Sequence, residues 1–397
     1  MISGTNTNPS IAIIGSGISG LAAAWLLHEH YDVTVFEAGN HIGGHSNTVA
    51  VPDFGPVDTG FIVLNEATYP NLLALFDHLG VEITKTDMAF GVSLNDGELE
   101  YGSDHIFAQK RNLVSPRYWR MLADIRRFYK QAPRDLKSGK LDDITLGAYL
   151  HNEKYSPAFI HDHIYPMAAA IWSTGTHDIG DFPASSFVRF FQNHGLLRLR
   201  DRPQWYTVHG GSREYVWKMT HGFRDKIRLN AAVTGVRRHM TGIVVRTARG
   251  DNEIYDHVIM ACHADQALAL LEDADGREEQ VLNAFPYSRN TAFLHTDTSL
   301  MPKNRKAWSS WNYMGDTQNG GVYVTYWMNR LQPYLPDTPD MFVTLNPPQP
   351  PRQDSIVHEQ TYDHPQFTAR APEGWANIHH VQGTYNTWFC GAWCGYG

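Results

Sequence analysis

The chain has 397 residues, of which 42% are hydrophobic and 19% charged, and its formal net charge is −8 at neutral pH. A chain of this length usually exceeds one hydrophobic core, so we expect two lobes that can interleave along the sequence. The acidic balance argues against a general nucleic-acid-binding protein, which needs a basic stripe against the phosphates. Three cysteines, Cys262, Cys390 and Cys394, form no even framework and no CxxC motif, which favours a reducing compartment such as the cytoplasm.

Residues 11–27 carry no charge, so a membrane span or a signal-peptide core has to be considered. We expect neither, because no basic leader precedes the run and Gly15, Gly17 and Gly20 interrupt it at the spacing of a phosphate-binding turn. No other segment is apolar enough to cross a bilayer. Any contact with a membrane would therefore be peripheral.

The first forty residues have the pattern of a strand, a glycine-rich turn, a helix and a second strand. The apolar IAIIG predicts a buried strand, LAAAWLLHEH a helix, and YDVTVFE a second strand. Gly15 permits the tight turn, Gly17 lets the backbone approach a diphosphate, and Gly20 lets the helix pack on the strand. The amides at the start of the helix then face the phosphates. The residues predicted to form this cradle are Gly15, Ser16, Gly17, Ile18, Ser19 and Gly20.

Glu37 ends the second strand, 22 positions after Gly15. A carboxylate at this place accepts hydrogen bonds from the hydroxyls of a ribose. It would also repel a 2′-phosphate, which disfavours NADP. The unit therefore predicts a dinucleotide-binding site.

The next residues, AGNHIGGHSNTV, resemble the FAD-binding amine-oxidase superfamily, which includes monoamine and polyamine oxidases, carotenoid desaturases and protoporphyrinogen oxidase. In that superfamily the acid is followed by a short loop and Gly-Gly-Arg. Gly43 and Gly44 match, and His45 stands in the arginine position. The resemblance implies that FAD is the cofactor and that Ala38, His45 and Ser46 also contact it.

The segment DTGFIVLN resembles the superfamily's Asp-x-Gly turn, which approaches the flavin, with Asp58, Gly60 and Phe61 in the matching places. A helix is expected directly afterwards. Thr68 can cap it, Pro70 suits its first turn, and Gly80 ends it.

Later blocks of the chain resemble the same superfamily in the same order. Residues 226–261 predict short alternating strands, among which the resemblance gives Val233 a backbone pair with adenine. VHGGSREYV resembles the turn that leads back from the substrate region. TWFCGAWCGYG resembles the last flavin-contacting strand and turn, where Gly391 matches and Ala392 occupies the usual acidic position. The superfamily's long helix would follow, so we favour a truncated chain over a dispensable helix.

The resemblance implies an α/β fold with two interleaved domains. One is a Rossmann-like FAD-binding domain of the glutathione-reductase type, amine-oxidase-like in its details. We assign residues 1–70, 205–285 and 376–397 to it. The other is an α+β substrate domain made of residues 71–204 and 286–375.

Residues 115–131 predict an amphipathic helix with Ser115 as its cap and Pro116 in its first turn. Tyr118 and Tyr129 belong to the apolar face. Basic residues occupy the other face, namely Arg117, Arg120, Arg127 and Lys130. Such a helix either lies on an anionic membrane or covers a packed core with a solvated face, and both interpretations stay open.

The substrate region offers few chemical groups. In amine-oxidising members a lysine holds a water at the flavin, and Thr291 stands in that place, which counts against a standard amine oxidase. His295 shares a strand face with Thr291 and is the candidate for proton handling, with a core histidine as the alternative. Trp172, Tyr326 and Trp327 line an apolar tunnel or simply fill the core. His161 and His163 form an HxH pair without a Cys or acidic partner, so we predict no metal site.

The blocks look closest to bacterial predicted NAD/FAD-binding proteins whose relatives occur beside, or fused to, cyclopropane-fatty-acid-synthase-like methyltransferases. That resemblance implies a fatty-acyl substrate from a modified membrane lipid. We therefore predict FAD-dependent dehydrogenation or desaturation of an acyl chain, with no nucleic acid as partner and the oligomeric state open. An amine oxidase, a flavin-dependent isomerase or mutase, and a protein that merely stores FAD are the alternatives.

Overall fold

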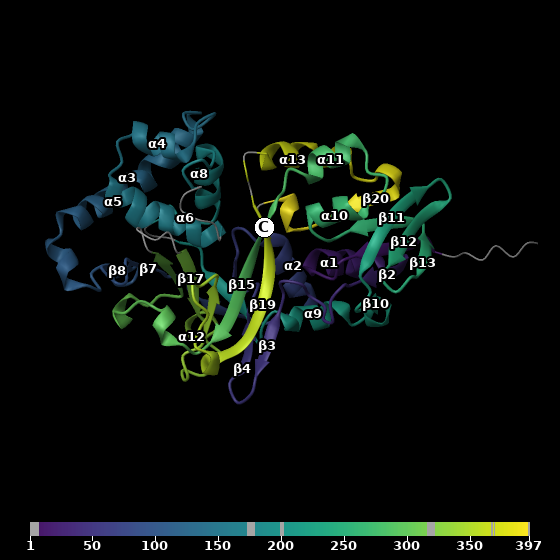
Figure 1. Cartoon of the computed structure of the whole chain (residues 1–397), viewed down its shortest axis with the longest axis horizontal. Helices are drawn as coiled ribbons and strands as arrows, with labels where there is room; N and C mark the ends of the chain where they lie inside the picture. The colour runs from purple at the N-terminus through teal and green to yellow at the C-terminus, as the bar shows by residue number, and fades with distance from the viewer. Residues whose placement is uncertain are drawn as a thin grey trace, which may run out of the picture.

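The computed structural model of the chain describes residues 8–172, 179–198, 202–315, 322–366, 368 and 370–395. Figure 1 shows helices α3 (Pro116–Lys137), α4 (Leu146–Asn152), α5 (Pro157–Phe159), α6 (Tyr165–Trp172) and α8 (Ala184–Asn193) gathered at one end, and helix α1 (Ile18–Leu27) with strand β2 (Asp32–Phe36) toward the other. The long strands β15 (Tyr287–His295) and β19 (Ile356–Pro365) lie side by side in the middle, between these two ends.

A parallel sheet of five strands lies at the end that carries helix α1. Its strand order is β10-β2-β1-β14-β20, and every neighbouring pair is parallel. The predicted strand, turn, helix and strand at the start of the chain are confirmed as β1, α1 and β2. The elements are β1 (Ser10–Ile14), α1 (Ile18–Leu27), β2 (Asp32–Phe36), β10 (Ile227–Arg228), β14 (His257–Met260) and β20 (Thr387–Phe389).

Both faces of the parallel sheet are covered. Ala12 and Ile14 of β1 pack in one apolar cluster, and Ile11 and Ile13 pack in another. This explains why the strand is apolar at every position instead of alternating. The covering elements are α1, α9 (Arg213–Thr220), α10 (Ala264–Leu270), α11 (Gly276–Leu282), α13 (Ala371–Asn377) and the antiparallel sheet of β11 (Val233–His239), β12 (Gly242–Thr247) and β13 (Asn252–Tyr255).

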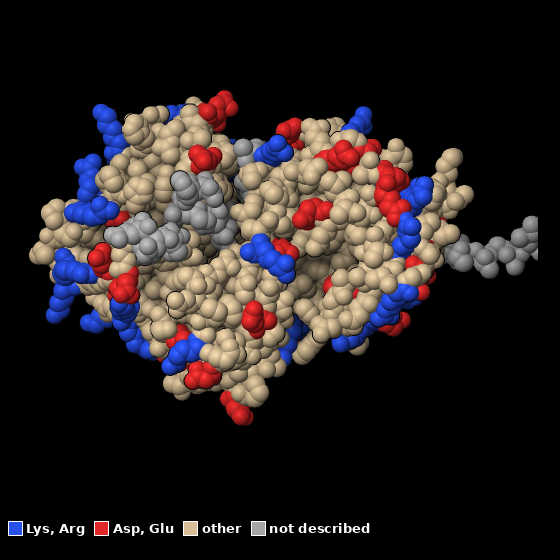
Figure 2. All heavy atoms as spheres, viewed as in Figure 1, with Lys and Arg blue, Asp and Glu red and all other residues tan. Residues whose placement is uncertain are grey.

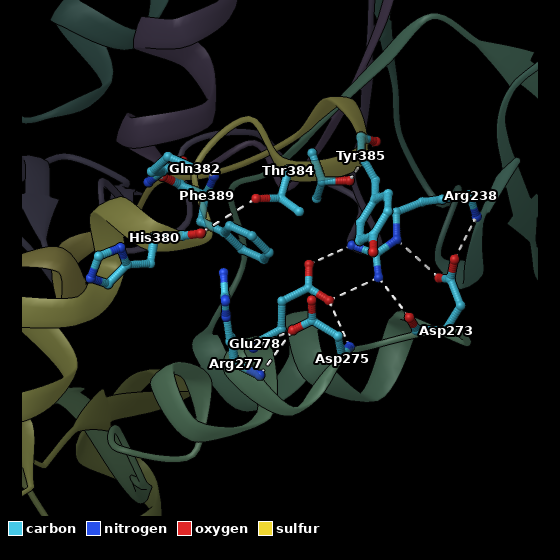
Figure 3. Close-up of polar contacts among 11 residues, drawn as sticks. Arg238, Asp273, Asp275, Arg277, Glu278, His380, Gln382, Thr384, Tyr385 and Phe389 are labelled. Atoms are coloured by element: carbon cyan, nitrogen blue, oxygen red, sulfur yellow. Dashed lines mark hydrogen bonds and ion pairs between the residues drawn. The ribbon is translucent and has the colours of Figure 1, made fainter. Parts of the chain in front are cut away.

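A buried ion pair joins β11 to α11 (Figure 3). Arg238 donates to both carboxylate oxygens of Glu278 and, over 3.0 Å, to Oδ1 of Asp273. Glu278 also accepts a 3.0 Å hydrogen bond from the amide of Asp275, which in turn caps α11. Arg238 is 8% exposed and Glu278 is fully buried. The antiparallel sheet is therefore fixed to the helical layer by a pair whose hydrogen-bonding groups are satisfied within the protein.

The second large sheet has seven strands in the order β19-β15-β18-β17-β16-β7-β8. Only the pair of β16 and β7 is parallel. The strands are β7 (Phe90–Leu94), β8 (Leu99–Gly102), β15 (Tyr287–His295), β16 (Trp311–Gly315), β17 (Val322–Trp327), β18 (Phe342–Leu345) and β19 (Ile356–Pro365), and α12 (Met328–Leu331) follows β17.

Helices cover one face of this sheet and share an apolar cluster with it. The longest of them confirms the predicted amphipathic helix, because Tyr118 and Tyr129 of its apolar face are buried. The predicted cap is confirmed as well, since Ser115 accepts a hydrogen bond from the amide of Tyr118. The helix runs beyond the predicted range. The covering helices are α3 (Pro116–Lys137), α4 (Leu146–Asn152), α5 (Pro157–Phe159), α6 (Tyr165–Trp172) and α8 (Ala184–Asn193).

Smaller elements join the two parts. The predicted helix after the Asp-x-Gly turn is α2 (Pro70–Leu79), which ends at Gly80 with φ of 63°. Its cap differs from the prediction: Tyr69 is the capping residue, and the Thr68 hydroxyl donates to Asn65 instead. The remaining strands are β3 (Thr48–Val51), β4 (Gly55–Asp58), β5 (Leu64–Asn65), β6 (Ile83–Thr86) and β9 (Trp205–Val208).

Within the described ranges, the structure has no helix whose length and apolar content would let it cross a bilayer.

Candidate functional site

The carboxyl ends of the five parallel strands meet at one edge of their sheet. The chain continues from β1 and β2 on one side of this edge and from β14 and β20 on the other. The order of the strands reverses between β1 and β14, and ligands of open α/β sheets bind in the crevice at such a point. Gly15 follows β1 there, and Ala261 follows β14.

The glycine-rich turn lies against the end of β14. Gly15 has φ of 108°, and a Cβ on it would lie 2.7 Å from the carbonyl oxygen of Ala261. A Cβ on Gly20 would overlap the carbonyl oxygen of Gly15 and approach Cβ of Ala261 to 3.0 Å. Gly15 and Gly20 are therefore required for the packing of the turn itself.

Gly17 has a different environment. A Cβ on it would meet no heavy atom of the described ranges within 4 Å. Gly17 is the N-cap of α1, where no side chain accepts a hydrogen bond from the first turn. The amides of Ile18 and Ser19 in that turn thus remain available to an anion, as at other diphosphate-binding helix ends. The open space and the uncapped amides fit the diphosphate of a dinucleotide.

Glu37 lies beside this turn. Its Oε2 accepts a 3.0 Å hydrogen bond from the amide of Ser16 as well as one from the Ser16 hydroxyl, and its Oε1 accepts one of 2.7 Å from the amide of Gly39. An ionised carboxylate has about four acceptor positions, so it can still accept from a ribose. Ala38, the next residue, is exposed. The amide of Ala231, just before Val233 and β11, donates 2.8 Å to the carbonyl of Glu37.

The Gly-Gly-His loop closes over the turn. The amide of Gly43 donates 2.9 Å to the carbonyl of Ser16, and a Cβ on Gly44, whose φ is 57°, would lie 3.2 Å from Cα of Gly17. Ser46 contacts the hydroxyl of Tyr215 in the core, so its side chain points away from the turn. The loop places its backbone, more than its side chains, next to the diphosphate cradle.

The Asp-x-Gly turn packs against the same loop. The amide of Phe61 donates 2.7 Å to the carbonyl of His45, and a Cβ on Gly60 would overlap that carbonyl oxygen. The three motifs that the sequence singled out are therefore adjacent in the structure. Their role in binding a cofactor stays a prediction that follows from this placement.

His45 occupies a buried position among other histidines. Its ring centroid lies 5.3 Å from that of His364 and 4.8 Å from that of Tyr362. Burial, together with the neighbouring His364 and His263, lowers the pKa of His45 to about 4. Its Nε2 is buried and has no hydrogen-bond partner among the residues that the structure describes. A neutral imidazole thus replaces the cation that the superfamily has there.

Asp58 forms a network that the sequence did not predict. It accepts hydrogen bonds from the hydroxyls of Thr48, at 2.6 Å, and Ser212, at 2.7 Å, and from Nε2 of Gln332, also at 2.7 Å. Burial raises the pKa of Asp58 to about 6, against the effect of these donors. The carboxylate ties the Asp-x-Gly turn to the turn at Gly211, so its contacts are structural.

Gly391 follows β20 at the same sheet edge. A Cβ on it would lie 2.6 Å from Nε1 of Trp393, a fully buried side chain. Trp393 donates 3.2 Å to the carbonyl of Cys262, which connects the ends of β20 and β14. Close packing of this tryptophan therefore explains the glycine.

The predicted substrate residues are dispersed over the seven-stranded sheet. Thr291 lies in the middle of β15, where its amide donates 2.9 Å to Oδ1 of Asn346. Tyr326 contacts two apolar clusters, and burial raises its pKa to about 12. Trp327, the next residue along β17, packs on Trp308 in a third cluster. Neighbouring residues of a strand point to opposite faces, so these two side chains do not line one pocket.

Two further predicted groups are placed as follows. His295 is fully buried, with Nε2 2.7 Å from the Thr344 hydroxyl and Nδ1 accepting a 3.0 Å hydrogen bond from the amide of Asp297. Both ring nitrogens are thus occupied, which favours the alternative of a core histidine.

Trp172 ends α6, and its side chain lies outside the described residues. No three His, Cys, Asp or Glu side chains in the described part of the chain are grouped to hold a metal.

Comparison with known proteins identifies the family. Residues 18–346 match the family described as flavin containing amine oxidoreductase. A putative flavin-containing monoamine oxidase of Mycobacterium tuberculosis is 27% identical over 265 residues, which are 62% of this chain and 56% of that protein. The chain thus spans little more than half the length of this relative.

Solved structures share the fold. Cyclohexylamine oxidase from Brevibacterium oxydans superposes with a TM-score of 0.68 at 17% identity, over 98% of this chain and 94% of that one. The fatty acid isomerase from P. acnes that produces CLA superposes with a TM-score of 0.66 at 15% identity, over 97% and 93%. These likenesses confirm the predicted amine-oxidase-like FAD-binding fold, and the family assigns FAD as the cofactor. The chain belongs to the flavin containing amine oxidoreductases, a family of FAD-dependent enzymes.

Proposed function

We propose that the protein is a FAD-dependent oxidoreductase that dehydrogenates or desaturates a fatty-acyl chain. The observation that carries this proposal is a cavity of about 820 Å³ at the edge of the helix-covered face of the seven-stranded sheet. Pockets of this size are typical of small-molecule sites with mainly apolar linings. Its lining combines two kinds of side chain. The apolar and aromatic ones are Leu94, Leu99, Val114, Tyr118, Tyr165, Tyr313 and Val322, and the polar and charged ones are Asn95, Glu98, Arg111, Asn112, Ser115, Arg117, His161 and Asp162.

The cavity borders a strand that leads inward. Val322 lines it, and Val324 and Tyr326 follow on the same face of β17 because side chains alternate along a strand. The four residue steps of the strand from Val322 to Tyr326 span roughly 13 Å. We infer that the acyl chain points from the cavity toward the side of β17 that carries Tyr326, with the apolar cluster that buries Val324 forming the wall between them. Trp172 stays part of this proposal by its position in α6 alone.

The residues of the cofactor site have separate roles in the proposal. The first turn of α1 would bind the diphosphate and Glu37 the ribose, which holds the cofactor in one orientation. FAD, when bound, accepts a hydride from a C–H bond of the substrate. As its double bond forms, the acyl chain would also release a proton, which passes to the solvent, and oxygen or another electron acceptor would reoxidise the reduced cofactor. Buried aromatic side chains would exclude water from the reacting carbon atoms.

We also propose the interleaved division predicted above: a FAD-binding domain around the five-stranded sheet and a substrate domain around the seven-stranded sheet. The three cysteines are free, which supports a reducing compartment such as the cytoplasm. The resemblance to bacterial proteins associated with cyclopropane-fatty-acid-synthase-like methyltransferases supports a lipid substrate.

Amine oxidation is the second candidate. The family description and the Mycobacterium relative favour it. Thr291 counts against it, since the resemblance places a lysine at that position in amine-oxidising members. Isomerisation without net redox change is supported by the shared fold of the fatty acid isomerase.

Anaerobic mixing of the FAD-loaded protein with two substrate panels tests the proposal. One panel contains fatty acids and phospholipids of different chain lengths, and the other contains simple and aromatic amines. We expect acyl substrates to bleach the absorbance band of oxidised flavin and to yield an unsaturated product by mass spectrometry. Bleaching by amines alone would reject the acyl proposal, and an isomerised product with no lasting bleaching would favour the isomerase.

A further inference from the structure

The outward side of helix α3 carries a row of cations. Arg126, Lys130, Arg134 and Lys137 are all exposed, and their spacing of three or four residues places them on one side of the helix. None of the four forms an ion pair with another residue of the described ranges. We call these four residues the basic face. Trp119 and Ala123 continue the same exposed row toward the start of the helix.

The basic face stands out against the charge of the whole chain. Residues 104–137 hold nine Lys and Arg against three Asp, whereas the chain carries 41 acidic and 33 basic residues. Of the three acids, Asp124 is buried and pairs with Arg120 and Arg127, Asp104 pairs with Arg330, and Asp135 pairs with Lys140. In Figure 2, Lys and Arg are prominent along the end of the molecule that carries α3 in Figure 1.

An apolar group lies directly before the helix. Leu113 and Val114, in the short helix η1 (Lys110–Val114), are 49% and 82% exposed, and Trp119 is 49% exposed. Nε1 of Trp119 donates 2.9 Å to the carbonyl of Leu113, and its ring centroid lies 5.4 Å from that of Phe107. Leu113, Val114 and Trp119 therefore form one patch, which we call the apolar tip.

The apolar tip also adjoins the proposed substrate cavity. Val114, Ser115 and Tyr118 line that cavity together with Arg111 and Arg117. A lipid held at the apolar tip would therefore lie beside the cavity.

We propose that the apolar tip and the basic face form a docking surface for an anionic phospholipid bilayer. Exposed cations beside a bilayer are attracted to anionic headgroups, while Trp, Leu and Val enter the boundary between headgroups and acyl chains. The charge of the surface selects this occupant: although the chain is acidic overall, the exposed side of α3 that begins at Trp119 continues into four cations without an ion-pair partner in the described ranges. This inference goes beyond the proposed function, because docking does not depend on which reaction the enzyme catalyses.

Co-sedimentation of the full-length, FAD-loaded protein with vesicles tests the proposal. Vesicles of phosphatidylcholine alone are compared with vesicles that contain one third phosphatidylglycerol, at low and at high salt. We expect binding only to the anionic vesicles and weaker binding at high salt, since salt screens exposed charges.

Three variants locate the surface. Arg126→Ala/Lys130→Ala/Arg134→Ala should lower the partition into anionic vesicles by on the order of tenfold to 100-fold, because each cation contributes independently. Val114→Asp should lower it by about tenfold, because it places a charge in the apolar tip. Arg224→Ala/Arg237→Ala/Arg277→Ala is the matched control. It makes the same change of net charge at exposed cations outside α3 and should bind like the wild type.

The proposal is overturned if the wild type ignores anionic vesicles, if it binds neutral vesicles equally well, or if the control loses as much binding as the α3 variant. A concentration-dependent dimer that Val114→Asp dissociates would assign the apolar tip to a second copy instead, which also overturns it. Flavin content and thermal unfolding of each variant show that the fold is intact. Vesicle binding is measured without turnover, so a failed acyl assay leaves this test unaffected.

Discussion

The amide of Ser16 donates a 3.0 Å hydrogen bond to the carboxylate of Glu37, which fixes the acid at the end of β2 against the turn at the end of β1. The carboxylate is thus oriented before a ribose arrives, and less freedom is lost on binding.

Glu37→Gln should weaken FAD binding by about tenfold to 100-fold, since hydrogen bonds to a charged group contribute about 1.5–3 kcal/mol. Titration of flavin-free protein with FAD, followed by flavin fluorescence, measures the change. Glu29→Gln, at an exposed acid beyond α1, should bind FAD like the wild type. Equal affinities of Glu37→Gln and the wild type would remove Glu37 from the site.

Two glycines of the turn should respond differently to alanine. Gly20→Ala should destabilise the protein by about 1–3 kcal/mol, because the new Cβ overlaps the carbonyl of Gly15. Gly17→Ala should leave the unfolding free energy nearly unchanged, since its Cβ meets no atom, yet it should weaken FAD binding by filling the space of the diphosphate. Urea unfolding of the flavin-free variants, paired with FAD titration, separates the two effects. Unimpaired FAD binding by Gly17→Ala would contradict the assignment of the cradle.

Arg238→Met should destabilise the protein by about 3–5 kcal/mol, because it leaves Glu278 buried and uncompensated. The double variant Arg238→Met/Glu278→Met should recover most of that loss, since no unpaired charge is then buried at Glu278. Urea unfolding at pH 7 measures the free energy of unfolding of the single and the double variant. Lys303→Met, which breaks an exposed pair with Asp96, is the control and should have little effect. A double variant no more stable than the single one would show that packing, not charge, dominates.

The cofactor half of the fold was predictable because its signals are local. Glycines, an apolar strand and an acid within the first 37 residues specify the βαβ unit without reference to the rest of the chain. The seven-stranded sheet was not predictable in this way, because strands that are neighbours in the sheet are distant in sequence. The parallel pairing of β16 with β7 joins Trp311 to Phe90, and no periodicity within either strand indicates that partner.

The same limit applies to the site. Asp58 matches a turn that the superfamily places near the flavin, but its partners Ser212 and Gln332 lie 154 and 274 positions away. His295 was selected because alternation places it on the face of Thr291. Its contacts with Thr344 and the amide of Asp297, which bury both ring nitrogens, could not be inferred from that alternation.

His45 should make stability depend on pH. Its pKa is lowered from 6.5 to about 4 in the folded chain, so the unfolded chain binds the proton more readily between these values. The neutral His45 ring therefore contributes at most about 3 kcal/mol to the free energy of unfolding. This contribution is fully present above pH 6.5 and is lost as the pH falls from 6.5 through 4. His45→Gln removes this group, so the unfolding free energy of the wild type should fall more steeply than that of the variant between pH 6.5 and 4. Parallel curves for the two proteins would show that His45 is not buried neutral.

The cavity should limit the length of the acyl chain. Leu99 lines the cavity from β8, so the indole ring of Leu99→Trp would fill part of the cavity. The kcat/KM for long acyl chains should fall by about tenfold or more, while that for short chains stays close to the wild-type value, because only a long chain reaches the added ring. Ile254→Trp, at an exposed strand position in the antiparallel sheet, is the control for a surface tryptophan. A uniform fall across all chain lengths would indicate a disturbed fold, and no change at any length would place the substrate elsewhere.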